Sequence, residues 1–436
     1  MQNQIKNFPE NPISLAIKLI GVGKRGSRHL SQEIIELVKQ EVMSIRKIDT
    51  QYAIQLGAFL SVLGIKENDE NEEKLFDELL SYFSKKLAGN FSKRDLDNYH
   101  FEILASYLFP TSEIKLKDSI VSVFLGNEIR ESEFEQIGRL FFTPVPKENE
   151  VEVFAARAFV TSIIRYRYTT KEEYFGLYKS FIKELEDKSL FAEKSFSDKI
   201  IIISEPFDGV SHSHIITPII TQKFCDMGYI PIVLVSQSPG PKNDLNLNDL
   251  IQENWLSIDH LLSQGFVMGK TYFCDLNLHF PIFLEWKLLR KYTLKRPFLS
   301  TMERFFNLFQ AHSYLGSAFH GNFNEIMMQL AKNIGYRNIQ IVRKGREGSL
   351  AFSLAKETEV YTAKKGIGNV YVDNFGKIEF KEKEIDDGRV PPDKEKNQQY
   401  IRAYLNNEEI NEEEYQRFKL RATYTLENIS KFFSTI

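Results

Sequence analysis

The sequence predicts an α/β protein of two domains, with an N-terminal all-helical domain over residues 1–196 and an α/β domain with a mainly parallel sheet over residues 197–436. The length of 436 residues exceeds the usual size of a single domain. Before Lys194, apolar residues recur at spacings of three and four, which is typical of amphipathic helices. After Lys194, short apolar runs alternate with segments of helix length, which is typical of a parallel sheet.

The apolar spacing of the N-terminal part predicts individual helices and their starts. Ser31 is the expected N-cap of one helix, and Asp49 or Thr50 that of the next, because their side-chain oxygens can accept from the first helical amides. The clearest helices are expected over residues 34–42, 54–63, 154–164 and 170–185.

The helical part also contains similar residues at a spacing of 81. Gln55-Leu56-Gly57 is matched by Gln136-Ile137-Gly138. This spacing indicates two similar helix pairs in tandem, or a chance likeness between two hairpins with small residues at their contacts. Two further pairs at the same spacing are Val42 with Val123 and Ile48 with Ile129.

Three apolar runs, 200–203, 230–235 and 339–342, predict strands of the sheet. The first is four consecutive isoleucines, so we expect it to be buried on both faces and to lead through a Pro and Gly turn into a helix near His214. Such a turn is the usual anion site of α/β proteins, but close approach of a phosphate requires glycines, and this turn keeps only Gly209.

Composition and charge exclude several classes of protein. The formal net charge of −3 gives no overall attraction to nucleic acid, so such a role would depend on local basic patches. Cys225 and Cys274 are too few for a disulfide framework and indicate a reducing compartment. The N-terminus lacks an apolar signal region and no apolar stretch reaches about 18 residues, so we expect a cytoplasmic protein without a membrane partner.

Other short motifs give little support for catalysis or metal binding. His212 and His214 form an H-x-H pair without a third ligand at a supporting spacing, and loop histidines explain them as well. The segment Gly345–Gly348 could hold an anion through its backbone amides. No nucleophile elbow, H-E-x-x-H motif or Walker-type loop occurs in the sequence.

Two N-terminal segments carry a resemblance to a known family. The run Gln55–Lys66 is similar to the helical-domain signature of the anthranilate phosphoribosyltransferase family. The run Gly21–Leu30 resembles the opening of one branch of that family, whose bacterial members lack the transferase activity and bind nucleic acid as dimers. The likeness covers roughly residues 18–66 and, after an insertion within about 68–196, most of 197–435. It implies the fold shared with nucleoside phosphorylases and a homodimer formed through the helical domain.

The catalytic motifs of the family are mostly replaced. Its phosphoribosyl-pyrophosphate loop Gly-Thr-Gly-Gly-Asp-Gly aligns with 204–209, where only Asp208 and Gly209 agree. Its Lys-His-Gly-Asn motif aligns with the segment that ends in Ser236-Gln237-Ser238-Pro239-Gly240. Its magnesium-binding Asp-Glu pair would fall at Leu350-Ala351, which offer no side-chain oxygen to a hard cation. We therefore expect no metal and no cofactor.

The segment that resembles the family's anthranilate-binding region is strongly basic. His279, Arg290 and Arg296 match that region, and Lys287, Lys291 and Lys295 are added to it. At helical spacing Lys287, Arg290 and Lys291 share one face, which suits backbone phosphates, while Trp286 or Tyr292 could stack on bases. A solvated helix face would show the same pattern. The candidate polyanion-binding residues are Lys24, Arg25, Arg28, Asp208, Gly209, His279, Lys287, Arg290, Lys291, Lys295, Arg296, Arg343 and Lys344.

These observations favour a non-catalytic protein that binds single-stranded nucleic acid or another polyanion without sequence preference. One alternative is a glycosyltransferase acting on an unidentified ribosyl donor, with Asp208 and His279 near its cleft and with magnesium and phosphoribosyl pyrophosphate as ligands. A second alternative is a structural partner of another protein, which the helical insertion would favour.

Overall fold

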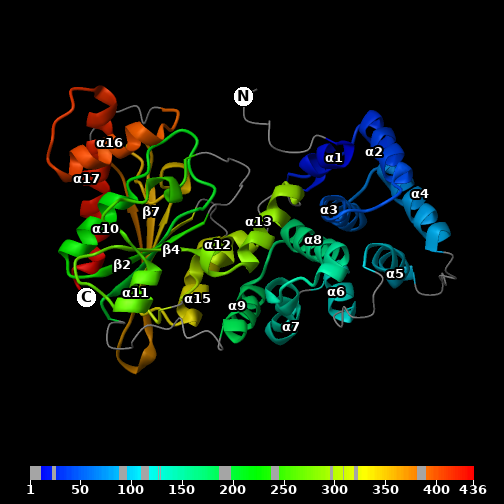
Figure 1. Ribbon diagram of the computed structural model, residues 1–436, viewed down its shortest axis with the longest axis horizontal. Helices are drawn as coiled ribbons and strands as arrows, with labels where there is room; N and C mark the ends of the chain where they lie inside the picture. Colours follow the sequence, from blue (N-terminus) through cyan, green and yellow to red (C-terminus); the bar gives the residue numbers. More distant parts are fainter. Residues whose placement is uncertain are drawn as a thin grey trace. The chain divides into compact units, whose positions relative to one another are not determined.

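The computed structural model divides into two compact units (Figure 1). One comprises Met1–Glu186 and Ile282–Met302, and the other Asp187–Pro281 and Glu303–Ile436. The sequence placed all of 197–436 in the α/β domain, whereas the contacts group 282–302 with the helical unit. The structure describes residues 11–21, 26–87, 96–109, 117–125, 127, 129–185, 198–236, 245–294, 298–307, 309–318, 323–380 and 389–436.

The described part of the first unit is helical, as the periodicity predicted. Ser31 caps the second helix by accepting from the Ile34 amide, and Asp49, rather than Thr50, caps the third by accepting from the Tyr52 amide. The helices are α1 (Pro12–Ile20), α2 (Gln32–Ser44), α3 (Thr50–Ile65), α4 (Glu70–Leu87), α5 (Leu96–Leu108), α6 (Lys117–Phe124), α7 (Glu131–Phe142), α8 (Glu150–Arg167), α9 (Lys171–Leu185), α13 (Ile282–Thr293) and α14 (Leu299–Met302).

Helices α3 and α8 form the centre of this unit. Every residue of α3 from Ala53 to Leu63 is buried, and α8 is buried on nearly all sides. The two helices approach so closely that a Cβ atom on Gly57 would lie 2.6 Å from the carbonyl oxygen of Ala155. Only glycine therefore fits at position 57 without moving a helix.

The helical unit repeats one set of contacts, at a spacing that differs from the predicted 81 residues. Buried Glu72 in α4 accepts from the amides of Leu30 and Asp69 and pairs with Lys66. Buried Glu173 in α9 makes the matching contacts, because it accepts from the amides of Ile129 and Thr170 and pairs with Arg167.

This repetition equates α2–α3–α4 with α7–α8–α9. The buried residues Ile35, Val38 and Val42 of α2 correspond to Phe134, Ile137 and Phe141 of α7, each 99 residues later. The capping pairs Asp69/Glu72 and Thr170/Glu173 lie 101 residues apart. A spacing of 81 would instead equate α3 with α7, which do not share these contacts.

The second unit is built on one eight-stranded sheet of order β3-β4-β2-β1-β5-β6-β7-β8. The pairs among the first six strands are parallel, and β7 and β8 are antiparallel to their neighbours. The strands are β1 (Ile200–Ser204), β2 (Ile230–Val235), β3 (Leu256–Ser257), β4 (Tyr272–Asp275), β5 (Ser313–Ala318), β6 (Asn338–Arg343), β7 (Thr358–Lys365) and β8 (Tyr371–Ile378). This architecture confirms the predicted α/β class with a mainly parallel sheet.

Strand β1 lies in the middle of the sheet and is fully buried, as predicted. Ile201 and Ile203 face a core formed with α10, α16 and α17, which pack on one another (Figure 1). The first of these helices begins at Thr217 rather than near His214, with Pro218 in its first turn. The helices of this unit are α10 (Thr217–Asp226), α11 (Ile258–Gln264), α12 (Leu276–His279), α15 (Phe323–Ile334), α16 (Lys394–Leu405) and α17 (Glu413–Phe433).

The position of β1 also fixes where a ligand would be expected. The chain passes from β1 to β2 on one side and later to β5 on the other, so the strand order reverses at β1. In open parallel sheets, ligands bind beyond the carboxyl ends of the strands at such a point.

Among the described residues, no helix is both long enough and apolar enough to cross a bilayer.

Candidate anion site at the end of the central strand

The loop between β1 and α10 binds an anionic side chain of the protein itself, the carboxylate of Glu347. The carboxylate of Glu347 accepts from the backbone amides of Ser211, at 3.0 and 3.1 Å, and of His212, at 2.8 Å. It also accepts from the hydroxyl of Ser213 at 2.8 Å. Consecutive amides and a hydroxyl directed at one carboxylate form the kind of cradle that binds phosphates in other α/β proteins.

The turn that carries Glu347 is shaped to direct this side chain. Glu347 has a φ of +53°, a left-handed conformation that is uncommon for residues other than glycine. A Cβ atom on Gly345 would lie 2.2 Å from the carbonyl oxygen of Ser349, so glycine is required at this position. The guanidinium of Arg346 donates to the His212 carbonyl at 3.4 Å. The sequence suggested that the amides of Gly345–Gly348 could bind an anion. In the structure, this segment instead provides an anion, the Glu347 carboxylate, to the amides of Ser211 and His212.

The two residues that align, by sequence resemblance, with the family's magnesium-binding pair lie in the protein interior. Leu350 and Ala351 are fully buried, and the Leu350 amide donates to the Glu205 carboxylate at 2.7 Å. Burial raises the pKa of Glu205 above its ordinary value of 4.5, although the Leu350 amide opposes this effect. One oxygen of the buried Glu205 carboxylate is thus already hydrogen-bonded to the Leu350 amide.

The raised pKa of Glu205 predicts how stability changes with pH. The folded protein keeps the proton over a pH range in which the unfolded chain has lost it, so this group lowers stability as pH rises from about 4.5 through the folded-state pKa. We expect Glu205→Gln to abolish this dependence, so that the variant gains stability relative to the unmodified protein over that range. Urea unfolding from pH 4 to 8 measures the difference. The exposed Glu253→Gln control should follow the unmodified protein, and parallel curves for Glu205→Gln would contradict the assignment.

Asp208 and Gly209, the two residues that agree with the loop of the family that the sequence resembles, are buried. Gly209 has a φ of +72°, and a Cβ atom there would lie 2.1 Å from the carbonyl oxygen of Leu245. Glycine is therefore required at position 209 because the backbone of Leu245 passes close to it. His279, at the end of α12, lies 3.7 Å from the carboxylate of Asp259 and is largely buried.

The basic helix α13 presents fewer cations than the sequence suggested. Arg290 is buried, while Lys287 and Lys291 are half-buried. Trp286 is 1% exposed and donates to the Phe141 carbonyl at 2.8 Å, so its ring cannot stack on a base. Among the described residues, neither Lys287 nor Lys291 has a carboxylate partner, and the Lys291 ammonium lies 5.2 Å from the centre of the Tyr292 ring.

The other predicted cations are paired, or lie outside the described residues. Arg343 and Lys344 contact the carboxylate of Glu359 at 2.8 and 2.5 Å, which neutralises part of their charge. Arg28 is exposed. The structure does not describe Lys24, Arg25, Lys295 and Arg296, nor the segment 237–240 that aligns with the Lys-His-Gly-Asn motif.

The two histidines of the H-x-H pair lie in different surroundings. His212 is exposed, whereas His214 is buried and its Nε2 lies 2.8 Å from a carboxylate oxygen of Glu414. Burial lowers the pKa of His214, although Glu414 opposes this effect. Glu414 in turn binds Lys396 at 2.6 Å. The pair therefore belongs to loop packing, as the sequence analysis allowed.

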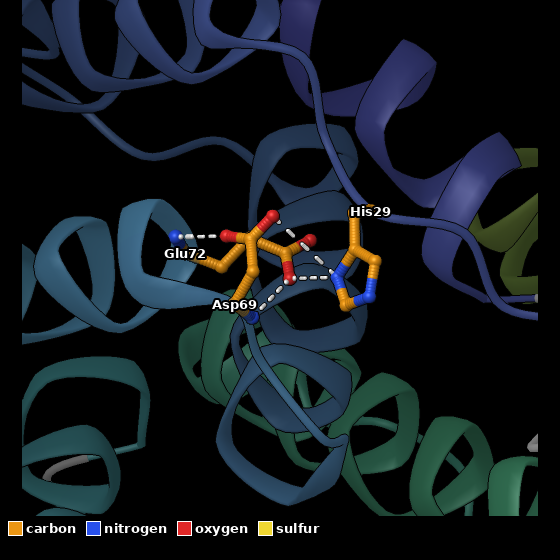
Figure 2. A group of neighbouring side chains, drawn as sticks. All are labelled: His29, Asp69 and Glu72. Atoms are coloured by element: carbon orange, nitrogen blue, oxygen red, sulfur yellow. Dashed lines mark hydrogen bonds and ion pairs between the residues drawn. The ribbon is translucent and has the colours of Figure 1, made fainter.

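A second cluster brings together His29, Asp69 and Glu72, whose side chains point toward one another (Figure 2). Their ligand atoms lie within 4.8 Å of each other, close enough for a metal ion. However, the buried Lys66 ammonium lies 2.5 Å from Glu72, and the same carboxylate accepts two backbone amides. Because Glu173 makes the matching contacts with Arg167, this network is best explained as helix packing.

Sequence reasoning identified the loop after β1 as the expected ligand position but missed Glu347 and Glu205 as the carboxylates that fill it. The turn Gly345-Arg346-Glu347-Gly348 gave a signal, since glycines on both sides of a carboxylate indicate a tight turn that directs it. Which loop the carboxylate meets depends on a contact across 134–136 residues of chain, which no local pattern reveals.

Comparison with known proteins identifies the fold. No family model and no curated protein sequence matches this chain. Anthranilate phosphoribosyltransferase from Thermus thermophilus is similar in structure, with a TM-score of 0.50 and 13% identity over 72% of this chain and 99% of that one. The enzyme from Saccharomyces cerevisiae, solved in complex with PRPP and Mg, has a TM-score of 0.53 and 9% identity over 74% of this chain and 99% of that one. This chain therefore has the anthranilate phosphoribosyltransferase fold.

Proposed function

We propose that this protein is a non-catalytic member of the fold that binds single-stranded nucleic acid without sequence preference. The observation that carries the loss of catalysis is the Glu347 carboxylate on the amides of Ser211 and His212. A transferase that expels diphosphate needs such donors and a metal to stabilise the departing charge. Here the donors are already used, and Leu350 and Ala351 offer no side-chain oxygen to a metal.

The lysines of α13 support the choice of a polyanion as ligand. Lys287 and Lys291 lie one turn apart on the same helix, and no carboxylate among the described residues neutralises them. Their half-buried side chains place the ammonium groups on a fixed helix, which lowers the entropy lost on contact with phosphates. Exposed Arg28 adds a further cation to the same unit. On the family resemblance, the proposal includes a homodimer formed through the helical unit.

We expect Lys287→Ala/Lys291→Ala to weaken oligonucleotide binding by about tenfold or more, because each lysine releases condensed counterions when it contacts a phosphate. The logarithmic salt dependence should also become shallower by roughly 0.7 for each lost contact. Fluorescence polarisation with labelled oligonucleotides at several salt concentrations measures both effects.

The matched control is Lys183→Ala, which removes an exposed lysine of α9 in the same unit. It should bind like the unmodified protein. Absent or salt-insensitive binding of the unmodified protein would refute the proposal. In that case, saturable calorimetric heat with magnesium and phosphoribosyl pyrophosphate would favour the transferase alternative.

A further inference from the structure

We propose that the segment Ser211–Ser213 is a site for a tetrahedral oxyanion, such as phosphate or sulfate, which the protein keeps closed with the carboxylate of Glu347. This inference concerns the α/β unit, whereas the nucleic-acid proposal rests on lysines of the helical unit. The two can therefore fail separately.

The donors of the segment form a complete receptor. Two consecutive backbone amides and one hydroxyl converge on a single carboxylate at 2.8–3.1 Å. Ser213 is 3% exposed, so its hydroxyl is held in the protein and not on a freely moving surface. Hydrogen bonds to an ionised acceptor are about twice as strong as neutral ones, so these donors have a marked preference for an anion.

The location of the segment Ser211–Ser213 also supports an oxyanion site. It follows the central strand β1, at the reversal of strand order where parallel sheets usually bind ligands. A tetrahedral oxyanion offers oxygens in geometry similar to that of a carboxylate and carries at least as much charge. It could replace Glu347 on the same donors if that side chain were absent.

The turn of Glu347 shows why the site stays closed. A residue with a φ of +53° is held in an unfavourable conformation, which persists only where the surrounding contacts compensate for it. An external anion must compete with a carboxylate that is covalently attached and thus present at a high effective concentration. In the unmodified protein we therefore expect no measurable binding of phosphate at this segment.

The test removes the internal anion and supplies an external one. Glu347→Gly relieves the left-handed backbone and opens the donors, so phosphate should bind at least about tenfold more tightly than to the unmodified protein. Calorimetric titration with inorganic phosphate measures this change. Thermal unfolding in phosphate, compared with chloride at equal ionic strength, should show a gain of roughly 2–4 °C for this variant alone.

Two controls locate the effect. Asn407→Gly changes another residue with a positive φ, an exposed one, and should not respond to phosphate. In the Glu347→Gly background, Ser213→Ala should reduce the gained phosphate affinity several-fold. If Glu347→Gly does not fold, Glu347→Gln decides, since it keeps the shape of the side chain but removes its charge. Its phosphate affinity should exceed that of the unmodified protein.

Three results would overturn the inference. The first is an equal phosphate response, or none, in the unmodified protein and in the folded Glu347 variants. The second is an affinity that Ser213→Ala leaves unchanged. The third is strong binding of phosphate by the unmodified protein, because the site would then be open. Oligonucleotide binding should be the same in Glu347→Gly and in the unmodified protein.

Discussion

Replacing Glu72 by leucine is expected to lower the free energy of unfolding by about 3–5 kcal/mol, because it leaves a buried ammonium without its counterion. The Lys66 side chain is 2% exposed, and its Nζ lies 2.5 Å from the Glu72 carboxylate. The amides of Leu30 and Asp69 would lose their acceptor as well. Urea denaturation followed by circular dichroism measures the loss.

The double variant Lys66→Met/Glu72→Leu separates the effect of the charge from that of packing. It removes both ions and should recover much of the lost stability, since apolar residues of similar size often replace buried ion pairs without loss. The half-buried pair of Lys39 and Glu78 lies at the surface and provides a control, and Glu78→Gln should change stability little. If Glu72→Leu were no more harmful than Glu78→Gln, Lys66 could not be buried as described.

The pKa of Glu72 gives the same network a pH dependence. Burial alone would raise this pKa, but hydrogen bonds from His29, Lys66 and two backbone amides outweigh burial and lower it. The resulting stability is fully present above the ordinary carboxylate pKa and is lost as pH falls through the folded-state value. In Glu72→Leu this acid-sensitive contribution disappears.

Replacing Glu285 by leucine is expected to destabilise the helical unit by a similar amount, about 3–5 kcal/mol. Arg157 in α8 is completely buried and binds the Glu285 carboxylate of α13 at 2.5 Å. Burial lowers the pKa of Arg157, and Glu285 opposes this effect. The guanidinium also donates to the carbonyls of Leu140 and Thr143, at 2.6 and 2.8 Å, so it is fixed in place and cannot reach water.

Because Glu285 attaches α13 to α8, its loss should also affect ligand binding. Lys287 and Lys291 lie on the same helix, so we expect oligonucleotide affinity to fall together with stability in Glu285→Leu. The double variant Arg157→Met/Glu285→Leu should restore stability. Glu131→Gln, which removes the partner of exposed Lys179, is the control and should change neither property. A stable Glu285→Leu variant would contradict the assigned role of Arg157.

The fold could be predicted from the sequence wherever one periodic signal dominated. Four consecutive isoleucines identified β1, and Ser31 and Asp49 marked the helix starts that the structure confirms. Strand β5 gave no such signal, because Ser313, Gly316 and Ser317 interrupt its apolar residues, although all are buried. The β7–β8 hairpin was missed because its strands are polar, with β8 largely exposed at the edge of the sheet.

The candidate site could be predicted only in part, because burial and pairing of charges depend on tertiary contacts. The sequence placed Arg290 with Lys287 on one basic face, but packing within the helical unit buries the arginine. It offered Arg343 and Lys344 as phosphate ligands, but the antiparallel partner strand β7 brings Glu359 beside them. Neither contact follows from spacing along the chain.

The matching networks around Glu72 and Glu173 have a consequence for how the helical unit is assembled. Central helices α3 and α8 occupy corresponding places in the two sets of three helices, and each covers the other. One polypeptide thus provides both halves of an interface that two identical subunits would otherwise share. The association of these two halves within one chain is therefore independent of protein concentration, and dilution cannot separate them.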